Sequence, residues 1–260
     1  MSFALLAAGI VLNAFVGGST AAPDPIPTAT ASVTPTPPLS EATPTAAATP
    51  TPTSGARASY CTVADRLTPY RAFDDYARTF LDWTDALPST YEPPDLVPVS
   101  MAGFSGEGRG NVVRAILIDD LKALRAAAGA AGHQLAVLSA YRSYGTQQST
   151  FAYWVSVGGY ERALRSSARA GHSEHQLGTA IDFSSGGTSK PWENDDWATT
   201  PPGKWLIQNA WRYGFVLSYP DGTENVTCYE YEPWHYRWIG RDKALAVRQS
   251  GLSLREYLAR

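Results

Sequence analysis

Two histidines, two carboxylates and two glycines lie close together in residues 167–183. Glycine and β-branched residues in the second half of this run argue against a helix. We therefore predict a loop over residues 171–178 and a strand over residues 179–183. A carboxylate among small and apolar strand residues is costly unless it is paired or binds a metal. Asp182 therefore needs a cation, and His175 is the nearest neutral nitrogen ligand.

A second run, residues 230–238, is dense in aromatic residues and contains Glu232 and His235. Pro233 blocks a helix and favours an extended chain, in which Glu232 and His235 point to opposite sides unless the backbone bends. We therefore expect a turn at one of them. Two histidines and one carboxylate, with a fourth position open for water, form a common catalytic zinc set.

The two runs together predict a metal hydrolase. Its ligands are His175, Asp182 and His235, and Glu232 is the general base that takes a proton from water and returns it to the leaving amine. Each residue taken singly has an ordinary structural interpretation, because a lone histidine near aromatic residues is more often a hydrogen-bonded residue of the core or rim. The prediction rests on the conjunction.

Three motifs follow one another along the chain: SAYRSY at residues 139–144, GHSEHQLGTAID at residues 171–182 and EPWHYR at residues 232–237. Together they closely resemble the VanY-type D-alanyl-D-alanine carboxypeptidases, zinc peptidases that trim the stem peptides of peptidoglycan. The run LPSTYEPPDLVPV, residues 87–99, is also similar to this family. None of the three motifs is specific alone, but their order and conjunction are.

The resemblance assigns substrate roles to three further residues. Arg142 follows a predicted strand, where it could stabilise a developing oxyanion or hold a terminal carboxylate, although position alone leaves a structural role equally open. In the family the arginine of this motif serves the substrate and the transition state. The resemblance also implies that Ser173 contacts the substrate backbone and that Gln147 or Gln148 binds substrate, and we assign Gln148.

His172 is the rival to His175 as a metal ligand. The two lie three residues apart, and their spacing does not separate them. The family pattern assigns the metal to His175, so we expect His172 to shape the loop or the rim of the site.

The implied activity is zinc-dependent hydrolysis of the terminal D-Ala-D-Ala bond of peptidoglycan stem peptides, by a monomer. Two alternatives stay open. An L,D-carboxypeptidase or an endopeptidase would use the same Zn²⁺ ligands and base with different contacts in the cleft. A non-catalytic, zinc-stabilised wall-binding module would have no need of a base, so Glu232 argues against it.

The N-terminal residues predict export. An apolar stretch over residues 3–16 is followed by small residues, as in a signal peptide, but no Lys or Arg precedes Arg57. We therefore interpret residues 1–22 as a signal peptide or a short membrane anchor. Residues 23–57, rich in Pro, Thr and Ala, predict a disordered linker. We therefore expect a secreted or cell-envelope protein whose N-terminus associates with the membrane or the wall.

The remaining residues, 58–260, are enough for one catalytic domain with a sizeable core. Cys61 and Cys228 are the only cysteines. In an exported protein such a pair predicts a disulfide, with two buried free thiols as the alternative. The net charge of −3 gives no support for nucleic-acid binding, which needs a basic patch.

Helical patterns outnumber strand patterns in this domain. We expect an α+β fold, in which a small antiparallel sheet flanked by helices carries the zinc site in a cleft, and the resemblance implies the same. A strand is predicted at residues 134–140, and helices are predicted at residues 111–129, 146–156, 161–170, 204–213 and 242–259.

Overall fold

The computed structural model describes residues 61–104, 111–185, 191–193 and 196–260. The predicted signal peptide or anchor at residues 1–22 and the predicted linker at residues 23–57 lie outside these ranges. None of the helices in the described part is long and apolar enough to cross a membrane.

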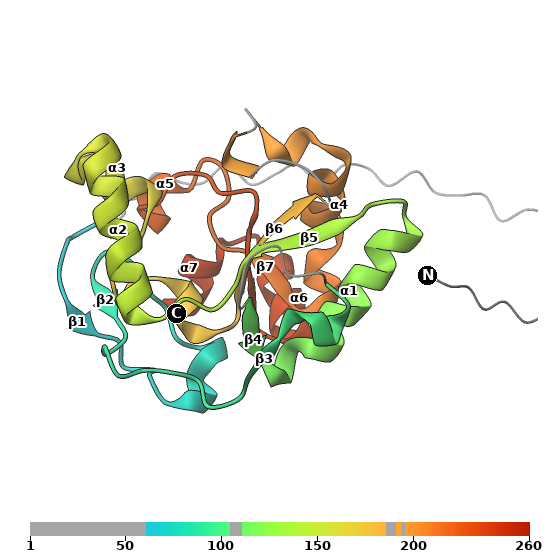
Figure 1. The fold of residues 1–260 in the computed structure, drawn as a ribbon, viewed down its shortest axis with the longest axis horizontal. Helices are drawn as coiled ribbons and strands as arrows, with labels where there is room; N and C mark the ends of the chain where they lie inside the picture. The colour runs from blue at the N-terminus through green and yellow to red at the C-terminus, as the bar shows by residue number, and fades with distance from the viewer. Residues whose placement is uncertain (1–60, 105–110, 186–190, 194–195) are drawn as a thin grey trace, which may run out of the picture. The chain divides into compact units, whose positions relative to one another are not determined.

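A four-stranded sheet at the centre positions the site, with strand order β5-β6-β8-β7 and every neighbouring pair antiparallel (Figure 1). In this sheet Asp182 of β6 lies directly opposite His235 of β8, so the register itself brings two of the predicted ligands together. The strands are β5 (Leu135–Ser139), β6 (Ala180–Ser185), β7 (Phe215–Leu217) and β8 (His235–Trp238).

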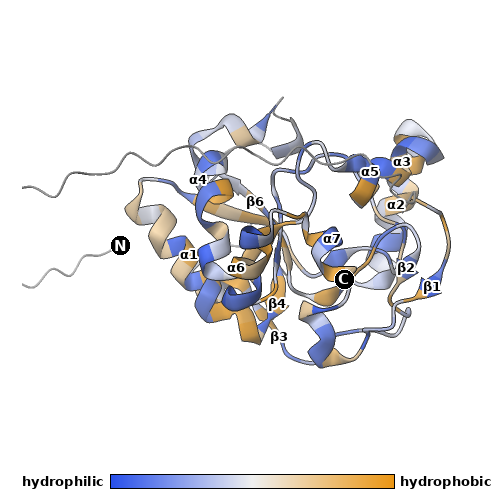
Figure 2. Ribbon diagram, turned by 180° about the vertical axis from the view of Figure 1, so that it is seen from behind, coloured by the Kyte–Doolittle hydropathy of each residue, from blue (hydrophilic) through white to orange (hydrophobic). Residues whose placement is uncertain are grey.

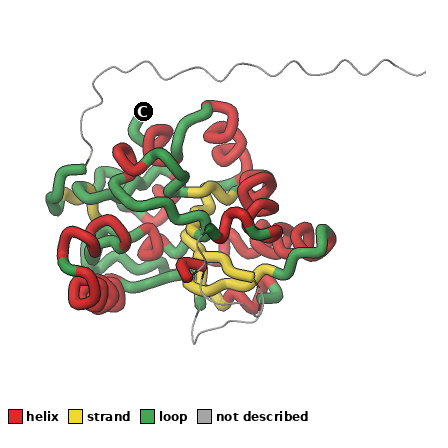
Figure 3. Tube along the Cα trace, turned by 90° about the horizontal axis from the view of Figure 1, so that it is seen from above, coloured by secondary structure: helices red, strands yellow, loops and turns green. Residues whose placement is uncertain are grey.

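Helices flank the sheet, as Figure 3 shows from above. The main hydrophobic core joins the inner face of α1 to β6, β7 and β8, through residues such as Leu121, Phe183 and Phe215. In Figure 2, α1 lies beside the β3–β4 pair, and both carry many apolar residues. The α-helices are α1 (Ile118–Ala130), α2 (Tyr144–Gly158), α3 (Tyr160–Ser166), α4 (Pro201–Asn209), α5 (Glu224–Thr227), α6 (Arg241–Ser250) and α7 (Leu254–Leu258).

Two short strand pairs and several 3₁₀ turns complete the described part. Strand β1 (Arg66–Leu67) pairs in parallel with β2 (Asp85–Ala86), and β3 (Leu96–Pro98) pairs antiparallel with β4 (Val112–Arg114). The 3₁₀ turns are η1 (Phe73–Ala77), η2 (Val99–Ala102), η3 (Ala115–Leu117), η4 (Glu174–Leu177), η5 (Pro191–Glu193), η6 (Trp197–Thr199) and η7 (Ala210–Tyr213).

The α+β prediction with a small antiparallel sheet is confirmed, but several helix predictions are wrong in extent. The helix expected at residues 161–170 ends at Ser166, and the one expected at residues 204–213 continues beyond Asn209 only as a 3₁₀ turn. The helix expected from residue 111 begins only at Ile118, because the β-branched Val112 and Val113 pair with β3. The terminal helix is broken into α6 and α7. Gly251 leaves the helical conformation with φ of 67°, and Ser253 starts α7 with a capping box.

A disulfide joins Cys61 to Cys228, with 5.3 Å between the Cα atoms. Cys228 ends α5 in the left-handed region, at φ of 70°, and is the one non-glycine residue of the described ranges with a positive φ. The chain then runs directly into residues 229–232, which line the site.

Candidate active site

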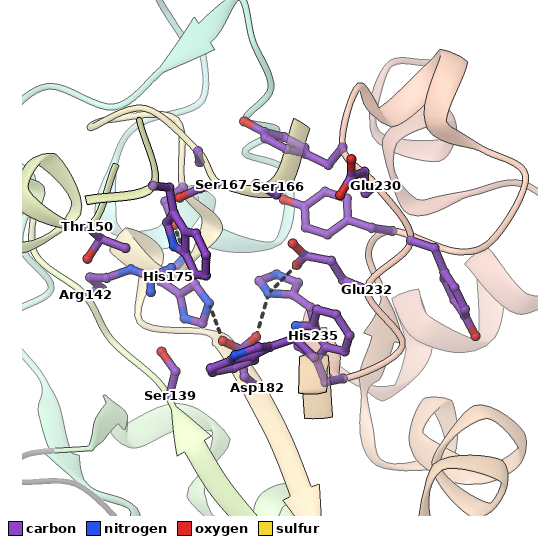
Figure 4. A pocket seen from close by; sticks show the side chains of 18 of the residues that line it. Ser139, Arg142, Thr150, Ser166, Ser167, His175, Asp182, Glu230, Glu232 and His235 are labelled. Atoms are coloured by element: carbon purple, nitrogen blue, oxygen red, sulfur yellow. Dashed lines mark hydrogen bonds and ion pairs between the residues drawn. The ribbon is translucent and has the colours of Figure 1, made fainter. Parts of the chain in front are cut away.

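The three predicted ligands converge at the floor of a pocket (Figure 4). His175 Nε2 lies 3.2 Å from Asp182 Oδ2, and His235 Nδ1 lies 3.0 Å from Asp182 Oδ1. One ligand atom from each residue falls within 4.8 Å of the others, and all three side chains are buried. η4, β6 and β8 supply one ligand each, so packing of the sheet holds the cluster.

Hydrogen bonds on the far side of each imidazole fix which nitrogen faces the cluster. His175 Nδ1 lies 2.6 Å from the Ala140 carbonyl, so it donates there and Nε2 keeps its lone pair. His235 Nε2 lies 3.1 Å from Glu174 Oε2, which leaves Nδ1 for the cluster. Two imidazoles, each oriented by a partner behind it, and one carboxylate form a set that fits a zinc ion.

Glu174 is the group behind His235. It accepts hydrogen bonds from Ser218 Oγ at 2.6 Å and from Arg237 Nη1 at 2.8 Å, and it is buried. Burial alone would raise its pKa, but Arg237 and the hydrogen bonds from His235 and Ser218 lower the pKa of Glu174 to about 2. The carboxylate is therefore charged at neutral pH and held in one orientation.

Neither Glu174 nor Arg237 received a role from the sequence, although both lie within the quoted motifs. Besides Asp182, Glu174 is the other carboxylate of residues 167–183. Its position between two histidines was the sequence feature that could have indicated a role in the site. Only tertiary structure shows that Arg237, fully buried, is its partner.

The floor is rich in negative charge. Burial opposes ionisation of Asp182, but His175 and His235 hold the pKa of this carboxyl far below its usual range. Burial lowers the pKa of His175, whereas the neighbouring carboxylates Asp182 and Glu174 outweigh burial and raise that of His235. The negative charge that raises the pKa of one imidazole would equally stabilise a divalent cation bound in the cluster.

Glu232 stands beside the cluster, with its Oε2 3.9 Å from His235 Nδ1. The turn expected from the sequence is present, since the His235 amide donates to the Glu232 carbonyl at 3.0 Å. The Glu232 side chain is 17% exposed. Burial, reinforced by the charge of Asp182, raises the pKa of Glu232 to about 8. A carboxyl with such a pKa can both take up and release a proton near neutral pH.

Arg142 lies on the other side of the ligands and lines the same pocket (Figure 4). Its backbone amide donates to the His175 carbonyl at 3.2 Å, which ties the end of β5 to the ligand turn. The buried Nε has no hydrogen-bond partner among the described residues. A guanidinium held this way is available to an oxyanion or a carboxylate of a bound molecule.

Of the other predicted site residues, one lines the pocket and one does not. Ser173 lines the pocket and caps η4, and its hydroxyl accepts a hydrogen bond from the His175 amide at 3.4 Å. Gln148 does not line the pocket and is exposed. Thr150 and Trp154, a helical turn apart on α2, face the pocket, and Gln148 points away from them.

Gln147 and His172 are buried elsewhere. Gln147 Nε2 donates to the Ala168 carbonyl at 2.6 Å. His172 Nδ1 lies 2.6 Å from the Asp82 carbonyl and its Nε2 lies 3.0 Å from Asp65 Oδ1, so both ring nitrogens are used away from the cluster.

The pocket extends well beyond the ligands, with a volume of about 460 Å³. We call its far side the outer wall. Figure 4 shows Ser166 and Glu230 there, across the pocket from Ser139 and Asp182. The outer wall is formed by α2, α3 and the segment after Cys228, through Trp154, Arg162, Ser166 and Glu230. No motif of the sequence pointed to this wall.

Comparison with known proteins gives a consistent set of relatives. The sequence profile of the family VanY: D-alanyl-D-alanine carboxypeptidase matches residues 110–241. The putative carboxypeptidase YodJ of Bacillus subtilis is 41% identical over 174 residues, which is 66% of this chain and 63% of that protein. A D-alanyl-D-alanine carboxypeptidase of Enterococcus faecium is 37% identical over 34% of this chain and 27% of its own length. The chain thus spans less than two thirds of either relative.

Solved structures share the fold. The LdcB LD-carboxypeptidase is 39% identical with a TM-score of 0.61, over 69% of this chain and 84% of that one. VanYB in complex with D-alanine-D-alanine is 27% identical with a TM-score of 0.57, over 71% and 98%. A vancomycin resistance D,D-pentapeptidase VanY mutant in complex with Zn(II) is 28% identical with a TM-score of 0.57, over 70% and 99%.

Proposed function

The chain belongs to the VanY family of D-alanyl-D-alanine carboxypeptidases, and from this membership we propose that it is a zinc-dependent carboxypeptidase of peptidoglycan stem peptides. The bond assigned is the terminal D-Ala-D-Ala peptide bond. The observation that supports the proposal is the convergence of His175, Asp182 and His235. Their ligand atoms lie within 4.8 Å of one another, and the Glu232 carboxyl lies beside them.

In this proposal His175 Nε2, Asp182 and His235 Nδ1 hold the zinc ion. When bound, zinc acidifies water and polarises the scissile carbonyl. Glu174 is a positioning residue: by accepting the Nε2 proton of His235 it keeps the Nδ1 lone pair directed at the cluster. Arg237, buried and hydrogen-bonded to Glu174, prevents that carboxylate from turning.

Glu232 serves as the general base and then as the general acid. It accepts the proton of the attacking water and passes it to the leaving amine. Its place on the turn before β8 sets the carboxyl beside the ligands without making it one. Burial keeps its affinity for a proton high enough for both steps.

Arg142 and Ser173 hold the substrate. Arg142 donates to the carbonyl oxygen on which negative charge develops, or to the terminal carboxylate, and its buried Nε without a partner supports this role. Ser173 contributes its hydroxyl to the peptide backbone at the pocket edge.

A second candidate is L,D-carboxypeptidase activity on the tetrapeptide. It is supported by the 39% identity to the LdcB LD-carboxypeptidase, against 27% to VanYB. Both candidates use the same ligands and base, and both place a monomer outside the cytoplasm against peptidoglycan, tethered or released at residues 1–22.

The test uses the full chain with stem pentapeptide ending in D-Ala-D-Ala and, separately, with the tetrapeptide, with zinc or with chelator, and reads the products by mass spectrometry. Chelator-sensitive loss of one alanine from the pentapeptide supports the D,D assignment. Cleavage of the tetrapeptide alone moves the assignment to L,D. If zinc binds and neither peptide is cut, the carboxypeptidase proposal fails.

A further inference from the structure

The outer wall holds a cation that nothing else in the site uses. Arg162 of α3 lines the pocket, and no carboxylate of the described residues lies within salt-bridge distance of its guanidinium. The one other charged group of the outer wall, Glu230, is paired with Arg165 at 3.6 Å. The pair cancels its own charge, so this side of the pocket keeps a net positive charge from Arg162.

Gly158, the last residue of α2, sets the direction of the Arg162 side chain. A Cβ built on Gly158 would come within 2.7 Å of the Arg162 Cδ, so the arginine stem lies where a side chain at residue 158 would be. The absence of that side chain lets Arg162 fold back against the end of α2. The stem of Arg162 thus lies against the end of α2, while the side chain as a whole stays exposed and lines the pocket.

The pocket is larger than the bond to be cut requires. A volume of about 460 Å³ accommodates several amino acid residues, whereas the ligands, Glu232 and Arg142 occupy only one end of it. The residue two positions before the scissile bond lies ~7 Å away along an extended chain. Its side chain can therefore cross the pocket to the outer wall.

We propose that Arg162 binds a carboxylate on the side chain of the substrate's third residue. This inference rests on the proposed function and adds a specificity to it. The enzyme then prefers stem peptides whose third residue is a diamino acid with a terminal carboxylate (meso-diaminopimelate) over peptides that carry lysine there. Trp154, which lines the same pocket, would then contact the methylene groups that both third-residue side chains share.

The experiment compares three peptides of equal length, with meso-diaminopimelate, with its side-chain carboxamide, or with lysine at the third position. For the unaltered protein we expect kcat/KM to be about fivefold to tenfold higher for the first than for the other two, as a single charge-assisted hydrogen bond at a partly exposed site provides. The preference should shrink as salt is added.

Two variants isolate the arginine. Arg162→Gln should lower kcat/KM for the diaminopimelate peptide to that of its carboxamide and leave the lysine peptide within about twofold. Gly158→Ala keeps the charge and favours the helix, but displaces the arginine stem, so it should reduce the same preference. The matched control is Arg248→Gln, on α6 and outside the pocket lining, which should change none of the three rates.

The outcomes separate the two proposals. If none of the peptides is cleaved, the proposed function fails before specificity is reached. If all three are cleaved equally by the unaltered protein, or if Arg162→Gln slows all three by the same factor, the activity stands and the role of Arg162 is overturned.

Discussion

The floor and the outer wall of the pocket are built in opposite ways. On the floor, His175, Asp182 and His235 are buried. Asp182 and His235 lie opposite each other in the sheet, and both histidines are oriented by partners behind them. On the outer wall, Arg162 and Glu230 are exposed, lie outside the sheet and have one weak ion pair between Glu230 and α3. Under the proposed function, the groups assigned to the chemistry are fixed, whereas those assigned to substrate selection stand on elements that can change without disturbing the fold.

The largest effect should come from removing the one floor group without a close partner. Glu232→Gln preserves volume, so zinc binding and thermal stability should be retained while kcat falls by about 100- to 10,000-fold. Steady-state kinetics with zinc measured by mass spectrometry checks this. Turnover within tenfold of the unaltered protein would remove Glu232 from its role and leave the floor as a binding site.

Loss of the disulfide should act on the whole fold and on the approach to the outer wall. Replacing Cys61 and Cys228 together by Ser opens a link across 167 residues and should lower the free energy of unfolding by about 2–5 kcal/mol. Urea unfolding of both proteins measures it. The same midpoint for both would mean that packing alone positions residues 229–232.

Acid should weaken the floor selectively through Glu174. Its pKa is about 2 in the folded protein and rises to the ordinary 4.5 on unfolding, so its contribution is complete above pH 4.5 and is lost as pH falls from there towards 2. That contribution is about 3 kcal/mol. Urea unfolding at pH 6, 4 and 3, with chelator present, should show a steeper loss for the unaltered protein than for Glu174→Gln. Parallel curves would contradict it.

The metal affinity of the floor should also depend on Glu174. Glu174→Gln keeps an acceptor for His235 but loses the charge, and should weaken zinc binding by about tenfold to 100-fold. Competition with a chromophoric chelator measures this affinity. Ser218→Ala, which removes a hydrogen bond to the same carboxylate but not its charge, serves as the matched control and should have a smaller effect.

The smallest effect is expected at Gln148, which the sequence analysis assigned to substrate binding but which lies outside the pocket lining. Gln148→Ala should leave kcat/KM within about twofold, because the side chain points away from the pocket. Thr150→Ala, on the same helix and in the pocket lining, provides the comparison. A tenfold loss in Gln148→Ala alone would show that α2 turns when substrate binds.

The sequence supported the floor better than the outer wall, for a physical reason. Ligand types in a short run, such as His175 and Asp182, restrict the chemistry without any knowledge of the fold, and the structure brings them together. Arg162 is an ordinary helix arginine in sequence, and only the placement of α3 at the pocket gives it significance. Gln148 shows the same limit, since only the packing of α2 decides that Thr150 and Trp154, and not Gln148, line the pocket.

The errors in secondary structure have a similar origin. Val112 and Val113 fell within the helix expected at residues 111–129, but pairing with β3 decided their conformation. Glu174 was recognisable as a carboxylate between two histidines, and its partner Arg237 was not, because 63 residues separate them in the chain.

The position of β8 has a consequence for how the protein is made. His235 and Arg237 lie on a strand that follows both β6 and β7 in the chain, yet this strand inserts between them, in the interior of the sheet. During synthesis β6 and β7 therefore exist first as unpaired edges. The nascent chain has neither the third predicted ligand nor the partner of Glu174 until β8 has been made and inserted, so the strand that closes the sheet also completes the cluster.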